Sequence, residues 1–168
     1  MYYLCYFFIS KEAKNMITAL DVANTFLVRA KNENIDISPM KLQKLIYILY
    51  KVYLKETKKR LFAEKFEVWK YGPVISDVYQ VFKKYRSNKI SDFYKKKDGS
   101  YTTVKLNNNP KFDKVFAEVW DKYSRVDGIY LSQLTHQKDT AWSKADERND
   151  YFLNDNEIFE ESEYEIGA

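Results

Sequence analysis

The segment from Ser38 to Thr57 constrains the fold most strongly, because it combines a helix start with a long apolar stripe. Ser38 is a preferred N-cap residue, and Pro39 follows at the first helical position, where its missing N–H costs nothing. Apolar side chains then recur at helical spacing, at Leu42, Leu45, Ile46, Leu49 and Tyr53. The pattern predicts a helix from Ser38 to about Thr57, and it places most lysines of this segment away from the apolar stripe.

Other parts of the chain carry similar helix signals. Thr18 followed by Asp21 resembles a capping box and predicts a helix ending near residues 32–34. Asn109-Pro110 predicts a second amphipathic helix that runs to about Ser124. Shorter helices are expected after Ser76, after Asp127-Gly128, after Thr140 and within the acidic stretch from Asn154 to Tyr164.

Two segments have the pattern of extended structure. Side chains alternate over residues 66–71, which predicts a short extended segment that Gly72-Pro73 ends. Asp98-Gly99 predicts a two-residue hairpin turn between Phe93 and Val104. The chain has only 4 Gly and 3 Pro, too few for the turns of a β-sandwich or barrel. We therefore expect a mainly α fold, a single compact helical domain with a small β-hairpin or short extended segments as a minor α+β component.

The composition argues against several functional classes. Cys5 is the only cysteine and His136 the only histidine, which excludes a disulfide framework and the paired-ligand zinc patterns. The apolar run of residues 2–9 is too short to span a bilayer and lacks the features of a signal peptide. We expect a cytoplasmic protein with no metal, no cofactor and no membrane partner.

Catalytic motifs are also missing from the sequence. It contains no glycine-rich phosphate loop, nucleophile elbow or paired-histidine helix. Acid–base catalysis would depend on His136 with a neighbour such as Asp139, but a lone histidine after a helix is usually structural. Cys5 has no nearby cation to lower the pKa of its thiol. We expect a protein that binds a macromolecule and is not an enzyme.

Charge is distributed unevenly along the chain. Residues 41–97 hold 16 Lys/Arg and 5 Asp/Glu, and acidic residues crowd the C-terminal end. This polarity favours oriented encounter with a charged partner, although lysines often only solvate helix faces. Tyrosine lies among basic residues at Lys83, Lys84, Tyr85 and Arg86, a composition that suits nucleic acid, but no helix-turn-helix or RNP motif accompanies it.

An ordered set of short motifs is more specific than these patterns. It consists of Lys41-Leu42-Gln43-Lys44-Leu45-Ile46-Tyr47, Leu61-Phe62, Trp69-Lys70-Tyr71-Gly72-Pro73-Val74, Val78-Tyr79, Leu131-Ser132, Leu134-Thr135-His136 and Trp142. In this order and spacing the chain resembles the SocA-like Panacea antitoxin domain, a phage-associated protein family once of unknown function, over roughly residues 19–159. The family often has a proline before the last tryptophan, where this chain has Ala141.

The resemblance implies an antitoxin of bacterial or phage origin that binds and neutralises a protein toxin encoded beside it. It implies no cofactor and no reaction. One branch of the family instead delivers its toxin to a cellular protease as an adaptor, which makes a protease a second partner to consider. Nucleic-acid binding, such as repression of its own operon, is the alternative function, with DNA as the partner.

The resemblance also suggests a division of the chain. Residues 16–168 are expected to form the Panacea-like helical domain with its acidic C-terminal stretch. Residues 1–15 are interpreted as an N-terminal extension or a mis-assigned start, because Met16 directly precedes the family-like portion.

Each residue of the family motif has two candidate roles, in the core or in partner contact. These residues are Lys41, Gln43, Lys44, Trp69, Tyr71, Gly72, Pro73, Tyr79, Thr135, His136 and Trp142. For Trp69, Tyr71 and Trp142 a core position is favoured, because large aromatic side chains usually stabilise by burial. The exposed candidates for partner contact are Lys41, Lys44, Lys70, Asp77, Gln80 and His136.

Overall fold

The computed structural model describes residues 16–106 and 108–167, so both the interpretation of residues 1–15 and the role of Cys5 lie outside the described residues. The described residues form seven α-helices, one 3₁₀ helix and a two-stranded antiparallel sheet. The predicted mainly α fold with a minor β component is confirmed.

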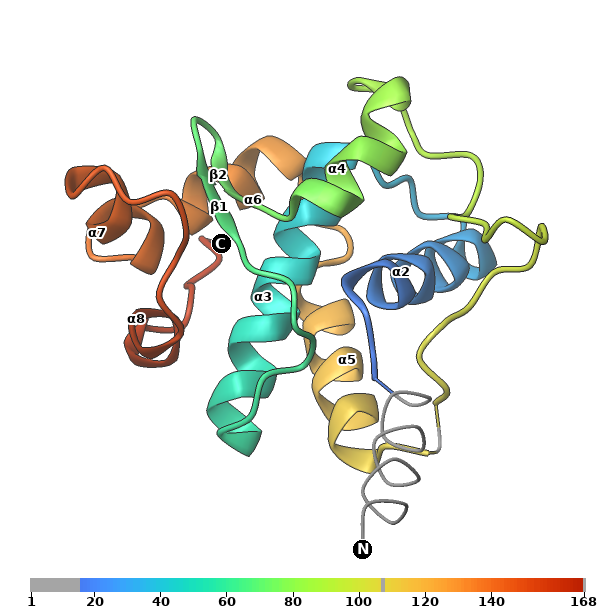
Figure 1. Ribbon diagram of the computed structural model, residues 1–168, viewed down its shortest axis with the longest axis horizontal. Coiled ribbons are helices and arrows are strands. Elements are labelled where there is room, and N and C mark those ends of the chain that lie inside the picture. The colour runs from blue at the N-terminus through green and yellow to red at the C-terminus, as the bar shows by residue number, and fades with distance from the viewer. Residues whose placement is uncertain (1–15, 107, 168) are drawn as a thin grey trace, which may run out of the picture.

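Helix α3 (Pro39–Thr57) runs through the middle of the molecule, with α7 and α8 on one side and α2 and α5 on the other (Figure 1). Its start is as predicted, because the Ser38 side chain accepts a hydrogen bond from the Lys41 amide. It contacts α2 (Ala19–Glu33), α4 (Ser76–Phe82), α5 (Pro110–Tyr123), α6 (Gly128–Thr135) and α8 (Asp155–Glu160). The predicted apolar stripe is largely buried, but the expectation that the lysines lie away from buried faces is wrong for Lys41, Lys44 and Lys51, because α3 has neighbours on nearly every side.

The helices on either side of α3 follow their local signals. Thr18 and Asp21 form the predicted capping box of α2, and Asn109 caps α5 through the Phe112 amide. Aromatic rings join the two helices, with the Phe26 and Phe116 ring centroids 4.9 Å apart. These helices supply one aromatic cluster of the core, and Tyr47, Tyr50, Phe62 and Phe66 form a second.

A β-hairpin lies against α3 and α6, formed by β1 (Glu67–Trp69) and β2 (Gly72–Val74). Trp69 pairs with Gly72, which leaves Lys70 and Tyr71 as the two-residue turn. The extended segment is confirmed, but the prediction that Gly72-Pro73 ends it is wrong. These two residues begin the second strand, and Gly72 has a φ of +101°, a conformation that favours glycine.

The second predicted hairpin, between Phe93 and Val104, does not form in the structure. Gly99 adopts the expected positive φ of +82° in a turn, but the flanking residues make no strand. Their backbone groups bond to helix α2 instead, since the Asn24 amide donates to the carbonyl oxygens of Tyr94 and Thr102. A side chain of α2 thus replaces part of the cross-strand ladder.

The remaining helices are short. Thr140 caps α7 (Ala141–Glu147) and Asp127 caps α6, as expected. Ser76 does not cap α4 but is its first residue, and the N-cap Ile75 has no side-chain hydrogen bond of its own. Residues Lys83–Tyr85 continue α4 as a 3₁₀ helix, and α8 ends at Glu160, earlier than the predicted Tyr164.

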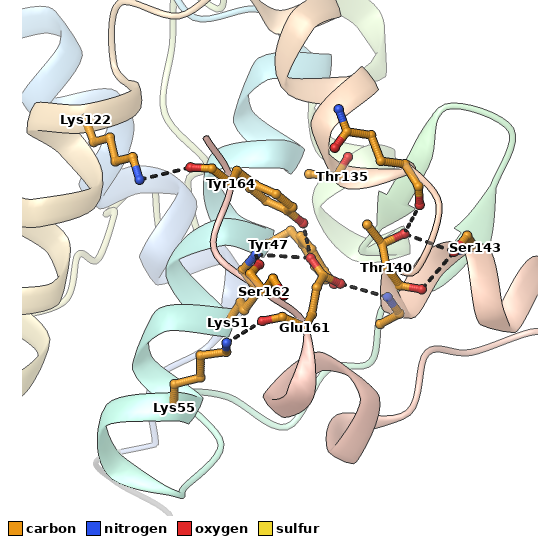
Figure 2. A network of polar contacts seen from close by, with 12 residues as sticks. Tyr47, Lys51, Lys55, Lys122, Thr135, Thr140, Ser143, Glu161, Ser162 and Tyr164 are labelled. Atoms are coloured by element: carbon orange, nitrogen blue, oxygen red, sulfur yellow. Dashed lines mark hydrogen bonds and ion pairs between the residues drawn. The ribbon is translucent and has the colours of Figure 1, made fainter. Parts of the chain in front are cut away.

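The C-terminal stretch is fixed to α3 by a buried carboxylate, that of Glu161 (Figure 2). Glu161 accepts hydrogen bonds from the hydroxyls of Tyr47 and Tyr164 and forms an ion pair with Lys51 at 3.1 Å. It also accepts the amide of Ala141 at 2.8 Å, which holds the start of α7. The acidic stretch is therefore not wholly a solvated tail, because one of its carboxylates is a central structural group.

Candidate protein-binding groove

The family motif on α3 includes a lysine whose environment the sequence does not predict. Lys44 is buried, and its ammonium donates a hydrogen bond of 2.8 Å to the carbonyl oxygen of Pro73 in β2. Burial lowers the pKa of Lys44 from 10.5 to about 7. Its assignment to the exposed surface is wrong, because the hairpin covers this part of α3.

Gln43, the residue before it, fixes the far end of the hairpin. Its side-chain amide donates to the carbonyl oxygen of Ile75 at 3.1 Å and accepts from the Ile75 amide at 2.9 Å. This pair of bonds satisfies the backbone at the start of α4, where a side-chain cap is lacking. Gln43 and Lys44 together hold strand β2 and the start of α4 against α3.

Gly72 allows the hairpin to approach α3 and α6 closely. A Cβ atom on Gly72 would lie 2.8 Å from Oγ1 of Thr135 and 2.9 Å from Nζ of Lys44. The Ser132 hydroxyl donates to the carbonyl oxygen of Tyr71 at 2.7 Å, which adds a bond from α6 to the turn. The motif residues Gly72 and Thr135 therefore act in packing the hairpin.

The two motif tryptophans meet on the other side of the hairpin. The Trp142 indole donates to the carbonyl oxygen of Trp69 at 2.9 Å, and its ring packs edge-on against His136 with centroids 5.3 Å apart. The Trp69 ring in turn packs edge-on against Tyr79 of α4 at 4.6 Å. Both tryptophans are half-buried, so neither is fully in the core.

These contacts leave a mostly apolar groove of about 390 Å³ between the first turns of α3, the hairpin and α4. Its walls contain Met40, Trp69, Tyr71, Val78, Tyr79 and Phe82. The charged residues that line it are all cations, namely Lys44, Lys70 and Arg86. Tyr71 is 55% exposed, so its predicted core position is wrong, and its ring forms part of the rim instead.

The other proposed contact residues do not gather at this groove. Lys41 is buried against Gly128 at the start of α6, and its placement on the exposed surface is wrong. Asp77 and Gln80 are exposed on α4, but neither lines the groove. His136 is half-buried and its Nδ1 contacts the carbonyl oxygen of Ser132, which indicates a structural role.

Sequence reasoning did not find Met40, Phe82 and Arg86 as residues of one site with the motif. The amphipathic pattern of Val78, Tyr79 and Phe82 was visible, but it could not show that this face of α4 is opposite the hairpin turn. A larger hollow of about 740 Å³ lies beside Met16 and Asn108, next in sequence to residues that the structure does not describe.

Neither a metal centre nor a membrane span emerges from the described residues. Within residues 16–106 and 108–167, no group of three or more His, Cys, Asp or Glu is placed to hold a metal ion. No helix in this part of the chain is long and apolar enough to cross a membrane.

The helical fold and the clamped hairpin define a small helical domain in which one sequence motif builds the hairpin and its contacts. Residues 42–143 match the family described as Antitoxin SocA-like, Panacea domain, a span from α3 to the first turn of α7. Because this span covers more than half of the sequence, the chain belongs to the Antitoxin SocA-like, Panacea domain family.

A curated relative extends this comparison. Antitoxin SocA of Caulobacter vibrioides (strain NA1000 / CB15N) is 39% identical over 66 residues, which are 39% of this chain and 35% of the relative. The chain thus matches about a third of the length of this relative. No solved structure matches the chain.

Proposed function

We propose that this protein is an antitoxin that neutralises a cognate protein toxin by direct binding, and that the groove between α3, the hairpin and α4 contacts the toxin. The observation that carries the proposal is that the family motif builds this groove, since Trp69 and Tyr79 form its wall and Lys44 its floor. Membership of the antitoxin family supplies the kind of partner.

The shape and composition of the groove suit a protein ligand. Binding hot spots are commonly apolar or aromatic side chains in a concave surface surrounded by polar residues. Here Trp69 and Tyr79 are half-buried side by side, while Lys70, Tyr71 and Arg86 are exposed around them. We propose that the protein acts by this contact alone, in the cytoplasm, without a cofactor and without catalysing a reaction.

Co-expression with the product of the adjacent gene tests the function. We expect that product to arrest growth alone, to be tolerated when this chain is present, and to co-purify with it. A toxin whose half-life shortens only when this chain and a protease are both present would favour the adaptor function. Tolerance without any complex would contradict neutralisation by binding.

Two exposed residues test the groove within the same experiment. Tyr71→Ala and Lys70→Glu should weaken the complex while the melting temperature stays nearly constant, because exposed substitutions usually change stability by about 0.5 kcal/mol or less. Tyr151→Ala and Lys59→Glu are matched controls, since both residues are exposed and lie outside the groove. If the control pair weakens binding as much as the groove pair, the toxin binds elsewhere.

The alternative function, DNA binding, has its own test. Lys83, Lys84 and Arg86 are exposed around one 3₁₀ turn, but the described fold places no recognition helix beside them. We expect no footprint on the promoter of the operon at physiological salt. A footprint lost on substitution of these three residues would make transcriptional regulation the better account.

A further inference from the structure

The charged residues that line the groove are all basic, while the Glu67 carboxylate nearby accepts a hydrogen bond from the Trp69 indole at 2.7 Å. Lys70 and Arg86 are exposed on its rim, and neither forms an ion pair with a carboxylate in the described part of the chain. Six exposed cations elsewhere in the described part of the chain do have such partners, for example Arg60 with Asp155 and Arg148 with Glu157. The rim therefore presents positive charge that the protein itself leaves uncompensated.

A buried lysine, Lys44, also lines the groove. Lys44 and Lys51 are both buried on α3, but only Lys51 has a carboxylate, that of Glu161 at 3.1 Å. The single hydrogen-bond acceptor of Lys44 among the described residues is the carbonyl oxygen of Pro73, although an ammonium has three N–H donors. Because burial lowers its pKa to about 7, the Lys44 amine is only partly charged at neutral pH, and the exposed Lys70 and Arg86 supply most of the positive charge at the groove.

The apolar part of the groove selects for a different chemistry. Between the rim cations lie the rings of Trp69, Tyr79 and Phe82 and the side chain of Val78. A volume of about 390 Å³ is within the range of sites that hold a small ligand, enough to seat one or two large side chains. A wholly polar acidic ligand would leave this apolar surface uncovered, and a wholly apolar ligand would leave Lys70 and Arg86 without partners.

We propose that the groove recognises a segment of the toxin in which a large apolar side chain is flanked by Asp or Glu. The apolar side chain packs on the rings of Trp69 and Tyr79, and the carboxylates lie at Lys70 and Arg86. This inference rests on the proposed function and specifies the chemistry of the partner. It is supported by charge complementarity, because the exposed cations Lys70 and Arg86 line the groove and no acidic residue does.

A random peptide library displayed on phage and selected against the full chain tests the inference without the toxin. We expect enrichment of peptides that carry Leu, Phe or Trp next to Asp or Glu. The enriched peptides, made as free synthetic peptides, should lose several-fold to about tenfold in affinity for a Lys70→Gln/Arg86→Gln variant at low salt. The loss should shrink as salt increases, because exposed charges are screened.

Two further variants separate the contributions of charge and apolar surface. A Lys59→Gln/Lys111→Gln variant removes the same net charge from exposed positions outside the groove and should bind the peptides as the wild type does. Tyr79→Ala should weaken binding at every salt concentration, because it removes apolar contact area.

Several outcomes would overturn the inference. The inference fails if the enriched peptides are free of carboxylates, if the two double variants lose affinity equally, or if no peptide is enriched on the wild type relative to Tyr79→Ala. If the toxin still co-purifies with the chain in any of these cases, the antitoxin proposal stands and only the assigned chemistry of the groove fails. If the peptides bind as expected and no toxin binds the chain, the assigned chemistry of the groove stands and the antitoxin proposal fails.

Discussion

The indole nitrogen of Trp142 lies 2.9 Å from the carbonyl oxygen of Trp69, which joins α7 to strand β1 although the two residues are 73 positions apart. This bond holds the backbone of Trp69 from one side while its ring packs on Tyr79 on the other. Trp142 does not line the groove, so it acts on the groove by positioning the hairpin.

Trp142→Phe should destabilise the protein by about 1 kcal/mol, because it removes one hydrogen-bond donor but keeps an aromatic ring beside His136. It should also weaken toxin binding and speed amide exchange in β1. Trp120→Phe is the matched control, since the Trp120 indole donates to Glu33 at 2.9 Å, far from the groove. Chemical denaturation, hydrogen exchange and binding measure the three effects. Equal loss of binding in both variants, in proportion to lost stability, would contradict a positioning role.

The two glycines with positive φ predict different costs for the same substitution. Gly99→Ala should cost about 1 kcal/mol, because the new Cβ meets nothing within 4 Å and only backbone strain remains. Gly72→Ala should cost about 1 to 3 kcal/mol more, because its Cβ would clash with the side chains of Thr135 and Lys44. Thermal unfolding of both variants measures the difference. Equal costs would show that the hairpin can move away from α3 at little expense.

The helix boundaries were accessible from sequence because capping is local. Thr18, Ser38, Asn109 and Thr140 each accept a hydrogen bond from the amide three residues further along the chain. A local pattern of this kind is sufficient to place the start of a helix. The mainly α fold followed from these starts.

The site was not accessible in the same way, because it depends on which segments cover α3. Lys44 and Lys51 were assigned to a polar surface by periodicity, but β2 covers the first and the C-terminal stretch covers the second. Both contacts, Lys44 with Pro73 and Lys51 with Ser162, join residues that are far apart in sequence. The motif supplies residues of β1, β2 and α3 that meet at the groove, whereas the position of each one in or around it depends on the fold.

The buried carboxylate of Glu161 predicts a large and specific loss of stability. Glu161→Gln would leave the Lys51 ammonium without its ion-pair partner, and breaking a buried pair in this way costs about 3 to 5 kcal/mol. The amide oxygen of the new glutamine would be a weaker, neutral acceptor for the donors that Glu161 binds, namely the hydroxyls of Tyr47 and Tyr164 and the Ala141 amide. Glu160→Gln, one residue earlier and exposed, is the control and should change stability by about 0.5 kcal/mol or less. Similar denaturation midpoints for the two variants would show that the C-terminal stretch contributes little to the fold.

Lys44 gives the protein a stability that depends on pH in a defined direction. Its pKa is lowered by burial from 10.5 to about 7, so the native state releases this proton at a lower pH than the unfolded chain does. Below pH 7 both states hold the proton, and the native state bears the full cost of the buried ammonium. Between about pH 7 and pH 10.5 only the unfolded state holds it, so the free energy of unfolding should rise with pH, by up to about 1.4 kcal/mol per unit.

Lys44→Met tests this because it removes the titrating group while keeping an unbranched side chain of similar length. The stability of the wild type relative to Lys44→Met should therefore increase from pH 7 to pH 9, measured by urea unfolding at fixed ionic strength. The pKa of Lys51, lowered to about 8 by burial, gives a slope of the same sign, but Lys51 is present in both proteins and its contribution cancels in the difference. Lys59→Met is the control at an exposed position, and its free energy of unfolding should change with pH as that of the wild type does. If the free energy of unfolding of Lys44→Met also changes with pH as that of the wild type does, the Lys44 ammonium keeps its proton to high pH. The surroundings of Lys44 are then better solvated than its burial indicates.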